Sequence, residues 1–273
     1  MPGNENEVIK FLFNNRENLD LSHIGKIDKI EIPKKDKLIE INYVEEIEKN
    51  SSSDSSKKAD VFLNSHGISI KENGSKLYNK FYRRDLNFIN KFINDKKTTK
   101  IVIKKIENKL KQIHTKSLKR DVMWSDLIEK KYFKPMLKYL MMDGKPSKKN
   151  KFPADYVLES SKNITTASDL SLYSFEEYFK KNYNYITFAF RRVWYGMTSG
   201  EHKRAKNICF HHEDSSNWCF KSIVSAPRKR KDGKSIWRDE IKEKDRRTAY
   251  YLDISQLKKW NIKFYHYFLA LVV

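Results

Sequence analysis

Cysteine, glycine and proline are scarce in this chain of 273 residues, which contains 2, 8 and 6 of them. Two cysteines are too few for a disulfide framework, so the sequence points to a reducing, cytoplasmic location. The low glycine and proline content excludes collagen-like and Pro/Gly-rich disordered proteins. No apolar run reaches the ~18 residues of a membrane helix, and no basic start followed by an apolar stretch marks a signal peptide. We expect a cytoplasmic protein that does not cross a membrane.

Acidic residues are also few relative to basic ones, with 35 Asp and Glu against 56 Lys and Arg and a net charge of +21. Such an excess destabilises the compact state by self-repulsion, and a polyanionic partner would relieve it. Nucleic acid is the first class of partner and an anionic membrane surface is the second. A composition rich in Lys, Asn and Ile would also result from AT-rich coding sequence.

A β-hairpin is the clearest local pattern. The segment SSSDSSKK at 51–58 is a loop, and ADVFLNSHGISIKE follows it at 59–72. Both halves of the second segment resemble strands, and the NSHG between them indicates a turn in which Gly67 is able to take a positive φ. Before the loop, residues 37–49 begin with strand-like alternation and end as an acidic, helix-like stretch, and the pattern leaves both open.

Helical and strand patterns alternate along the rest of the chain. Residues 76–94 are expected to form one helix, because four aromatic or aliphatic residues recur at helical spacing: Leu77, Phe81, Phe88 and Phe92. In the first half of the chain we also expect a strand at 100–104, a charged helix after it to about 116, and a helix at 125–142 that is kinked by Pro135. In the second half we expect a short helix that begins at Ser174, a strand or helix at 185–195, a strand at 250–254 and a packed apolar end at 264–273. This mixture without repeats predicts an α/β (α+β) fold around a sheet.

The hairpin brings together residues that suit phosphodiester chemistry. Ser69 and Lys71 are two residues apart on the second strand and therefore point to the same face. Asp60, at the base of the first strand, comes near both across the mouth of the hairpin. A carboxylate can hold Mg²⁺, and a lysine can orient or deprotonate the attacking water and stabilise the developing charge.

Asp60 followed by Ser69-Ile70-Lys71 resembles the motif of the PD-(D/E)XK nucleases, and IKENGSKLYN after it resembles type II restriction endonucleases. The resemblance covers about residues 57–79. It implies a central mixed β-sheet flanked by helices, Mg²⁺-dependent hydrolysis of double-stranded DNA, and a homodimer acting on a short palindrome. We accordingly expect one nuclease domain over 1–273, with a catalytic hairpin near 59–72 and DNA-contacting insertions at about 185–250.

The chain departs from the family pattern at Ser69, where the second acid should stand, because a hydroxyl is a poor Mg²⁺ ligand beside a carboxylate. Some restriction enzymes carry this acid on the helix after the lysine strand. In this chain that implies Asp85, fourteen residues after Lys71, on the apolar stripe of the expected helix. Glu72 is a second candidate, although alternation turns it to the face opposite Lys71. In many of these nucleases a glutamate of an N-terminal helix supplies a further ligand, and the candidates for it here are Glu40, Glu45 and Glu46. Of these we choose Glu46, so the expected metal ligands are Asp60, Asp85 and Glu46.

Paired basic residues are the candidate DNA contacts. Lysines neutralise phosphates without reading sequence, and arginines can contact guanine edges in the major groove. The basic loop at 227–234 is the best candidate for entering a groove. The expected DNA-binding residues are Arg83, Arg84, Arg191, Arg192, Lys203, Arg204, Arg228, Lys229, Arg230 and Lys231.

Three other interpretations compete with the nuclease hairpin. In the first, Asp60 and Lys71 form an ordinary cross-strand ion pair worth less than ~1 kcal/mol. In the second, the chain is a basic nucleic-acid-binding protein without catalytic activity. The third is a ββα-metal nuclease that acts through a histidine general base near Glu213 and Asn217, the candidates being His202, His211 and His212.

Overall fold

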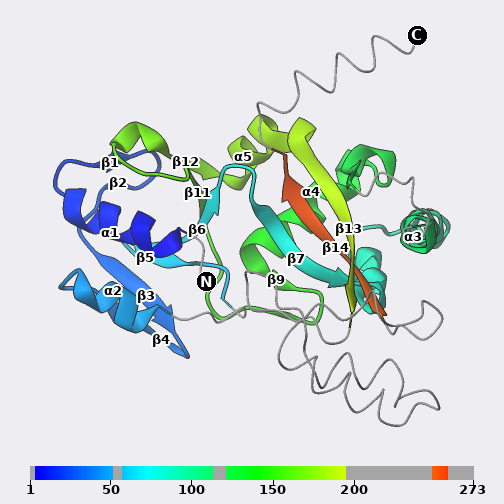
Figure 1. Ribbon diagram of the computed structural model, residues 1–273, viewed down its shortest axis with the longest axis horizontal. Helices are drawn as coiled ribbons and strands as arrows, with labels where there is room; N and C mark the ends of the chain where they lie inside the picture. Colours follow the sequence, from blue (N-terminus) through cyan, green and yellow to red (C-terminus); the bar gives the residue numbers. More distant parts are fainter. Residues whose placement is uncertain (1–3, 52–56, 113–120, 195–247, 258–273) are drawn as a thin grey trace, which may run out of the picture. The chain divides into compact units, whose positions relative to one another are not determined.

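The computed structural model describes residues 4–51, 57–112, 121–194 and 248–257 (Figure 1). The contacts between Cα atoms divide the chain into two compact units, 1–189 together with 253–273, and 190–252. The second unit is described only at 190–194 and 248–252, which are parts of two strands. The prediction of a single domain over the whole chain stays a prediction. In the described part of the chain, no helix combines the length and the apolar character needed to cross a membrane.

A six-stranded mixed sheet carries the hairpin. Its strand order is β12-β11-β6-β5-β3-β4. The neighbours β6 and β11 run parallel, whereas the other four pairs are antiparallel. The strands are β3 (Ile30–Lys34), β4 (Lys37–Glu40), β5 (Val61–Leu63), β6 (His66–Glu72), β11 (Tyr156–Ser160) and β12 (Leu170–Ser174). The prediction of a mixed sheet flanked by helices is confirmed.

Two helices pack with one face of this sheet into a common core. In α1 (Glu5–Asn15), Val8, Ile9 and Leu12 recur at helical spacing and are all buried. The helix α2 (Glu45–Asn50) adds Ile47, which is fully buried. The open question about 37–49 is thereby answered, because the stretch contains both a strand, β4, and a helix, α2. The sheet contributes to this core Ile30, Ile32, Val61, Leu63, Ile68, Ile70, Leu158, Leu170 and Leu172.

The hairpin is formed by β5 and β6, as the sequence predicts. Leu63 pairs with His66, so the turn consists of Asn64 and Ser65, whose φ angles are 47° and 69°. Two successive positive φ values match the right-handed twist of the strands in a two-residue hairpin turn. The Asn64 side chain also accepts hydrogen bonds from the backbone of Asp28 and Lys29 at 2.9 and 3.0 Å.

Gly67 has a different role from the one expected. It lies within β6 and is not among the residues with positive φ. A Cβ atom on Gly67 would lie 2.3 Å from the carbonyl oxygen of Pro153. The glycine therefore permits the backbone before β11 to approach the hairpin closely.

The expected helix at 76–94 is wrong. The structure has a strand, β7 (Lys76–Tyr82), followed by a 3₁₀ helix, η1 (Arg83–Lys91). Leu77 and Phe81 are both buried. Residues four apart share a face in a strand as well as in a helix, so this spacing does not separate the two.

The strand β7 belongs to a second, four-stranded sheet with the order β7-β14-β13-β8. Its other members are β8 (Asp121–Met123), β13 (Ile186–Trp194) and β14 (Thr248–Gln256). The strand expected at 250–254 is present, and the stretch 185–195, for which the sequence left strand and helix open, contains a strand. An aromatic group accompanies it, in which the Trp124 and Phe133 rings are stacked with centroids 4.6 Å apart. Phe188 of β13 meets Phe133 edge to face at 5.6 Å.

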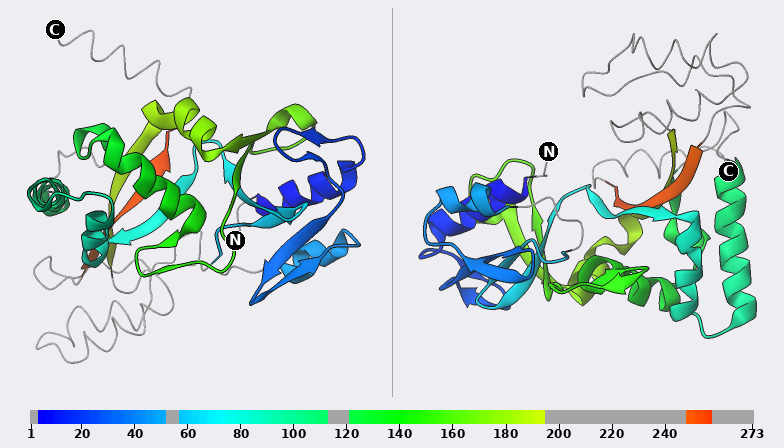
Figure 2. Two further views of the ribbon diagram at one scale, coloured as in Figure 1. Left: turned by 180° about the vertical axis from the view of Figure 1, so that it is seen from behind. Right: turned by 90° about the horizontal axis from the view of Figure 1, so that it is seen from below.

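The remaining helices partly match expectation. A single helix, α3 (Lys96–Gln112), replaces the expected strand at 100–104 (Figure 2). The helix α4 (Lys130–Lys138) contains Pro135 and continues as a π-helical turn, η3 (Tyr139–Asp143). The helix α5 (Phe175–Asn182) begins at Ser174 with a reciprocal capping box to Glu177, as predicted. The short elements are β1 (Asp20–Leu21), β2 (Gly25–Lys26), η2 (Trp124–Asp126), β9 (Gly144–Lys145), β10 (Lys148–Lys149), η4 (Ala167–Asp169) and η5 (Tyr183–Tyr185).

Replacing Gly67 by alanine should destabilise the fold. The new Cβ would meet the Pro153 backbone at 2.3 Å, so a strand must move. We expect a loss of about 1–3 kcal/mol in the free energy of unfolding, measured by urea titration. As a control, Ser65→Gly in the adjacent turn should change stability less, because glycine accepts the φ of 69°. A Gly67→Ala protein as stable as the wild type would contradict the close approach.

Candidate functional site

Asp60 immediately precedes β5 and is held by two backbone hydrogen bonds across the hairpin. Its amide donates to the carbonyl of Ile68, and its Oδ2 accepts from the amide of Ile70, both at 2.8 Å. The carboxylate is partly exposed, and its other oxygen, Oδ1, is not used in this bond. Asp60 is thus fixed beside β6 with one carboxylate oxygen engaged by the strand.

The second strand presents Ser69 and Lys71 on one face and Ile68, Ile70 and Glu72 on the other, by the alternation of β6. Since Val61 pairs with Ile68, Asp60 belongs to the same face as Ser69 and Lys71. Lys71 is partly exposed. The geometry expected for Asp60, Ser69 and Lys71 is therefore present, and Glu72 lies on the opposite face, as predicted.

Ser69 is only 1% exposed, and its hydroxyl has no hydrogen-bond partner among the described residues. An unpaired buried hydroxyl costs stability. It stands where the motif would have its second acid, on the face of Asp60. The hydroxyl is therefore a polar atom on this face that could still form a hydrogen bond.

Glu5, which the sequence interpretation missed, is the acid that the structure adds to this site. It is the first residue of α1 and is partly buried. Burial and the neighbouring Asp60 carboxylate raise the pKa of Glu5, while Lys71 and Lys57 act in the opposite direction. The preceding Asn4 donates to the Ser161 carbonyl at 3.0 Å, which fixes the start of the helix next to the end of β11.

The signal for Glu5 was present in the sequence. Two acids, Glu5 and Glu7, precede the apolar residues Val8, Ile9 and Leu12, which is typical of the first turn of an amphipathic helix. An N-terminal helix glutamate was expected at 40, 45 or 46 instead.

Lysines surround the two carboxylates. Burial, followed by repulsion from Lys71, lowers the pKa of Lys58 from 10.5 to about 8, whereas Asp60 raises it and Lys145 lowers it further. The Lys58 ammonium lies 4.8 Å from the centroid of the Tyr78 ring. Lys58 precedes Asp60 by two residues, so strand-like alternation would direct both to one face. The site therefore combines two acids with a concentration of positive charge.

A buried polar network lies on the neighbouring strand. Glu159 of β11 pairs in register with Lys71 and is 6% exposed. Its carboxylate accepts from Lys181 of α5 at 3.0 Å and from Gln256 of β14 at 3.2 Å. Gln256 also donates to Asn182 at 2.9 Å. These bonds engage Glu159 in the packing between β11, α5 and β14.

Two expected metal ligands, Asp85 and Glu46, have other interactions in the structure. Asp85 lies in the first turn of η1 and not on the stripe of a long helix, and its charge contributes to raising the pKa of Tyr78 after burial. Glu46 accepts hydrogen bonds from the amides of Asn42 and Tyr43 at 2.9 and 3.3 Å, which caps the start of α2. In the described ranges, no three His, Cys, Asp or Glu side chains form a group able to hold a metal. The grouping of Asp60 with Asp85 and Glu46 stays a prediction.

None of the ten predicted DNA-binding side chains is among those that the structure describes. The backbones of Arg83 and Arg84 lie in η1 and those of Arg191 and Arg192 in β13, but the description does not extend to their side chains. The remaining predicted contacts and the histidines of the alternative nuclease site lie outside the described residues: Lys203, Arg204, Arg228, Lys229, Arg230, Lys231, His202, His211 and His212.

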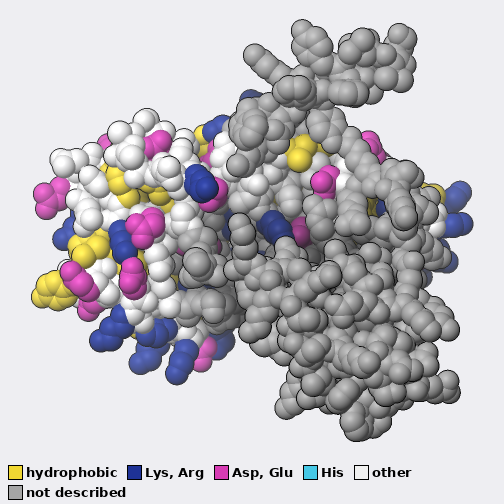
Figure 3. Space-filling view, in the orientation of Figure 1, with side chains coloured by type: hydrophobic (Ala, Val, Ile, Leu, Met, Phe, Trp, Pro, Cys, Tyr) yellow, Lys and Arg dark blue, Asp and Glu magenta, His cyan; other side chains and the backbone are white. Residues whose placement is uncertain are grey.

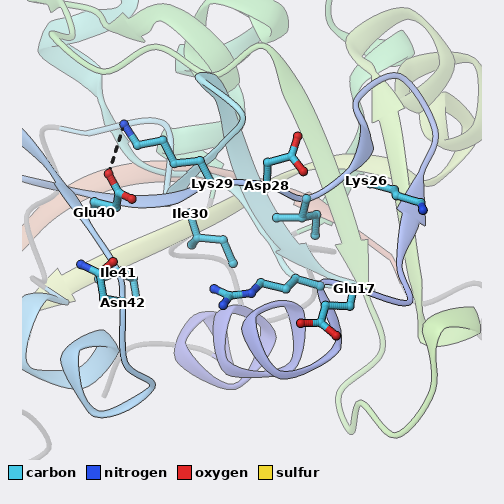
Figure 4. Close-up of a pocket in the computed structure, with 10 residues that line it drawn as sticks. Glu17, Lys26, Asp28, Lys29, Ile30, Glu40, Ile41 and Asn42 are labelled. Atoms are coloured by element: carbon cyan, nitrogen blue, oxygen red, sulfur yellow. Dashed lines mark ion pairs between the residues drawn. The ribbon is translucent and has the colours of Figure 1, made fainter.

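A separate hollow of about 400 Å³ lies near the end of α1 and strands β2, β3 and β4 (Figure 4). Its charged lining is balanced, and Lys29 pairs with Glu40 at 3.4 Å within it. It contains none of the hairpin's acids or lysines, so it is not part of the Asp60 site. The charged residues that line it are Arg16, Lys26, Lys29, Glu17, Asp28 and Glu40.

Comparisons of the chain with protein-family models, with curated proteins and with solved structures find no match.

The lowered pKa of Lys58 predicts a pH-dependent stability. Between pH 8 and 10.5, Lys58 is protonated in the unfolded chain but not in the native state. The contribution of Lys58 to the free energy of unfolding therefore rises with pH in this range. Lys58→Met removes the charge and should stabilise the protein at pH 7, with an advantage over the wild type that shrinks as the pH approaches 10. Chemical denaturation at several pH values measures the difference. The exposed Lys37 provides the control, since Lys37→Met should show no such trend, and an equal trend in both would contradict the assignment.

Proposed function

We propose that this chain is a Mg²⁺-dependent nuclease of the PD-(D/E)XK type that hydrolyses double-stranded DNA. The observation that carries the proposal is the meeting of Asp60 and Lys71 on one face of the hairpin with Glu5 in electrostatic range of both. The resemblance implies a mixed sheet flanked by helices, and the six-stranded sheet is of this kind. The position of α1 supports a glutamate of the N-terminal helix as the second acid.

The side chains of this site fit a Mg²⁺ ion. Mg²⁺ is commonly bound by one or two carboxylates, with water and substrate phosphate completing its shell. Asp60 and Glu5 would hold it. The Asp60 charge raises the pKa of Glu5, and a divalent cation would relieve that repulsion. The unpaired hydroxyl of Ser69 supports a further polar occupant on the same face.

The proposed reaction is phosphodiester hydrolysis. The attacking water loses a proton as its oxygen bonds to phosphorus, the bond from phosphorus to the leaving sugar oxygen breaks, and the leaving oxygen takes up a proton from solvent, so that one water is consumed. When bound, Mg²⁺ polarises the phosphate and lowers the pKa of the attacking water. Lys71 would orient that water and stabilise the charge that develops on the phosphate. Lys58 and Lys145 would attract the phosphate into the site by their charge.

Within this class, we place the chain with type II restriction endonucleases, which act in the cytoplasm as homodimers on short palindromes. The net charge of +21 supports a polyanionic substrate. The resemblance of the motif at Asp60 and Lys71 to that of the PD-(D/E)XK nucleases supports cutting over mere binding.

Removing the charge of Asp60 or Lys71 should abolish cleavage. Asp60→Asn retains a carbonyl oxygen that can accept the Ile70 hydrogen bond, so the fold should persist. Lys71→Met keeps the aliphatic stem. We expect each variant to lose at least about a hundredfold in the rate of cutting phage DNA with Mg²⁺, while binding in Ca²⁺ survives.

Asp36→Asn and Lys37→Met, in the turn and strand at β4, are the matched controls and should cut normally. Discrete bands from the wild type would support site-specific restriction, and a smear would support a nuclease without sequence preference. Normal cutting by Asp60→Asn would overturn the assignment of the site. Intact DNA under all conditions would favour the alternative interpretation, a nucleic-acid-binding protein without catalytic activity.

Mg²⁺ alone should stabilise the wild-type protein. A ligand that binds only the native state raises the thermal midpoint, and relief of the repulsion between Glu5 and Asp60 adds to this effect. We expect Glu5→Gln to reduce the Mg²⁺-induced shift in the midpoint, measured by differential scanning fluorimetry. Glu7→Gln, two residues along the same helix and ion-paired with Lys10, should keep the full shift. Equal shifts in both variants would contradict the assignment of Glu5 as a ligand of the metal.

A further inference from the structure

The helix α3 is the most basic element that the structure describes. Its 17 residues contain one acid, Glu107. Its lysines are Lys96, Lys97, Lys100, Lys104, Lys105, Lys109 and Lys111. None of the basic positions predicted from the sequence to bind DNA lies in this helix.

The lysines of α3 are arranged on one side. Thr99, Val102 and Ile106 are buried, and the helix packs against η1. With 3.6 residues per turn, Lys97, Lys100 and Lys104 fall within about 60° of one another, on the side opposite this buried stripe. All three are exposed, and they extend over about 10 Å of helix. We call these three lysines the α3 basic face.

This arrangement opposes the stability of the helix itself. Lys96 and Lys97 lie in the first turn, where the helix dipole disfavours positive charge and which itself contains no acid. Lys100 and Lys104 are like charges at a spacing of four residues, which repel. Asp95 before the helix accepts hydrogen bonds from the amides of Lys97 and Thr98, so its carboxylate is engaged by backbone. A helix whose charges oppose its own stability is suited to a polyanionic partner.

Other basic side chains of the molecule are engaged differently. On the face drawn in Figure 3, basic side chains gather at the lower left, over the end of the sheet where β4 lies. In the β3–β4 turn, Asp36 forms an ion pair with Lys151 at 2.5 Å. Lys34 donates to the Lys49 carbonyl and to Asn50. Acids and backbone carbonyls thus share the charge in that region.

We propose that the α3 basic face docks on the sugar–phosphate backbone of double-stranded DNA, outside the catalytic hairpin. Double-stranded DNA carries about one negative charge per 1.7 Å of its axis, which matches a row of ammonium groups along one helix. Lysine contacts to phosphate hold the duplex without reading its sequence. The inference rests on the proposed function only for the choice of double-stranded DNA as the polyanion.

The test measures the salt dependence of binding to a 30-base-pair duplex of arbitrary sequence, in EDTA so that no cleavage occurs. The full-length chain is compared with the variant Lys97→Gln/Lys100→Gln/Lys104→Gln. Removing one lysine that neutralises a phosphate should reduce the slope of log K against log salt by about 0.9, so we expect a slope smaller by about 2.7 for the three. The thermal midpoint of the variant should be unchanged or higher, because repulsion has been removed, which verifies folding.

Two matched variants show whether the change in slope depends on the position of the lysines in α3 and on their positive charge. Lys26→Gln/Lys162→Gln/Lys180→Gln removes the same charge from exposed lysines on other elements and should nearly retain the slope. Replacing the three α3 lysines by arginine should retain it fully. An unchanged slope in the α3 variant, or an equal reduction in the scattered variant, would overturn the proposal.

A wild-type chain that fails to bind the duplex would overturn it too, as would an α3 variant that loses binding to phosphatidylserine vesicles but not to DNA. Because no cleavage is measured, the docking proposal can succeed even if Asp60→Asn and Lys71→Met reveal no nuclease.

Discussion

Alternation along the central strand β6 is the constraint on which the rest of the structure depends. Ile68 and Ile70 enter the core under α1, so Ser69 and Lys71 must emerge on the other face. Pairing with β5 on one side and β11 on the other fixes the register of this strand twice. A slip by one residue would exchange Ile68 and Ile70 for Ser69 and Lys71 on the face that packs against α1, so packing and site geometry are specified together.

The charges of the site are tied to the same strand. Asp60 is held by the amide of Ile70, a core residue, so the position of the carboxylate depends on the packing of β6. Glu5 reaches the site from the start of α1, whose next turns supply Val8 and Leu12 to the core. Neither acid stands on a free loop. Rigid elements of this kind give the precise placement that a catalytic or metal-binding group needs.

Local signals in the sequence were sufficient for the hairpin, for the capped start of α5 and for β14, because turn residues, a capping box and alternation act over a few residues. They failed at β7, since Leu77 and Phe81 are four residues apart and share a face in either secondary structure. That error placed Asp85 on a helix stripe that does not exist. Glu5 was missed because its relation to Asp60 depends on tertiary packing between residues 55 apart in sequence, which no short motif records.

The parallel pairing of β6 with β11 has a consequence for the order in which the protein is completed. The hairpin ends at Glu72, whereas its parallel neighbour begins only at Tyr156. During synthesis the hairpin therefore exists before the strand that covers its other edge, and a large loop must close to bring the two together. The face of β6 that carries Ser69 and Lys71 acquires its final shape only when more than half of the chain has been made, because β11 ends at Ser160 of 273 residues.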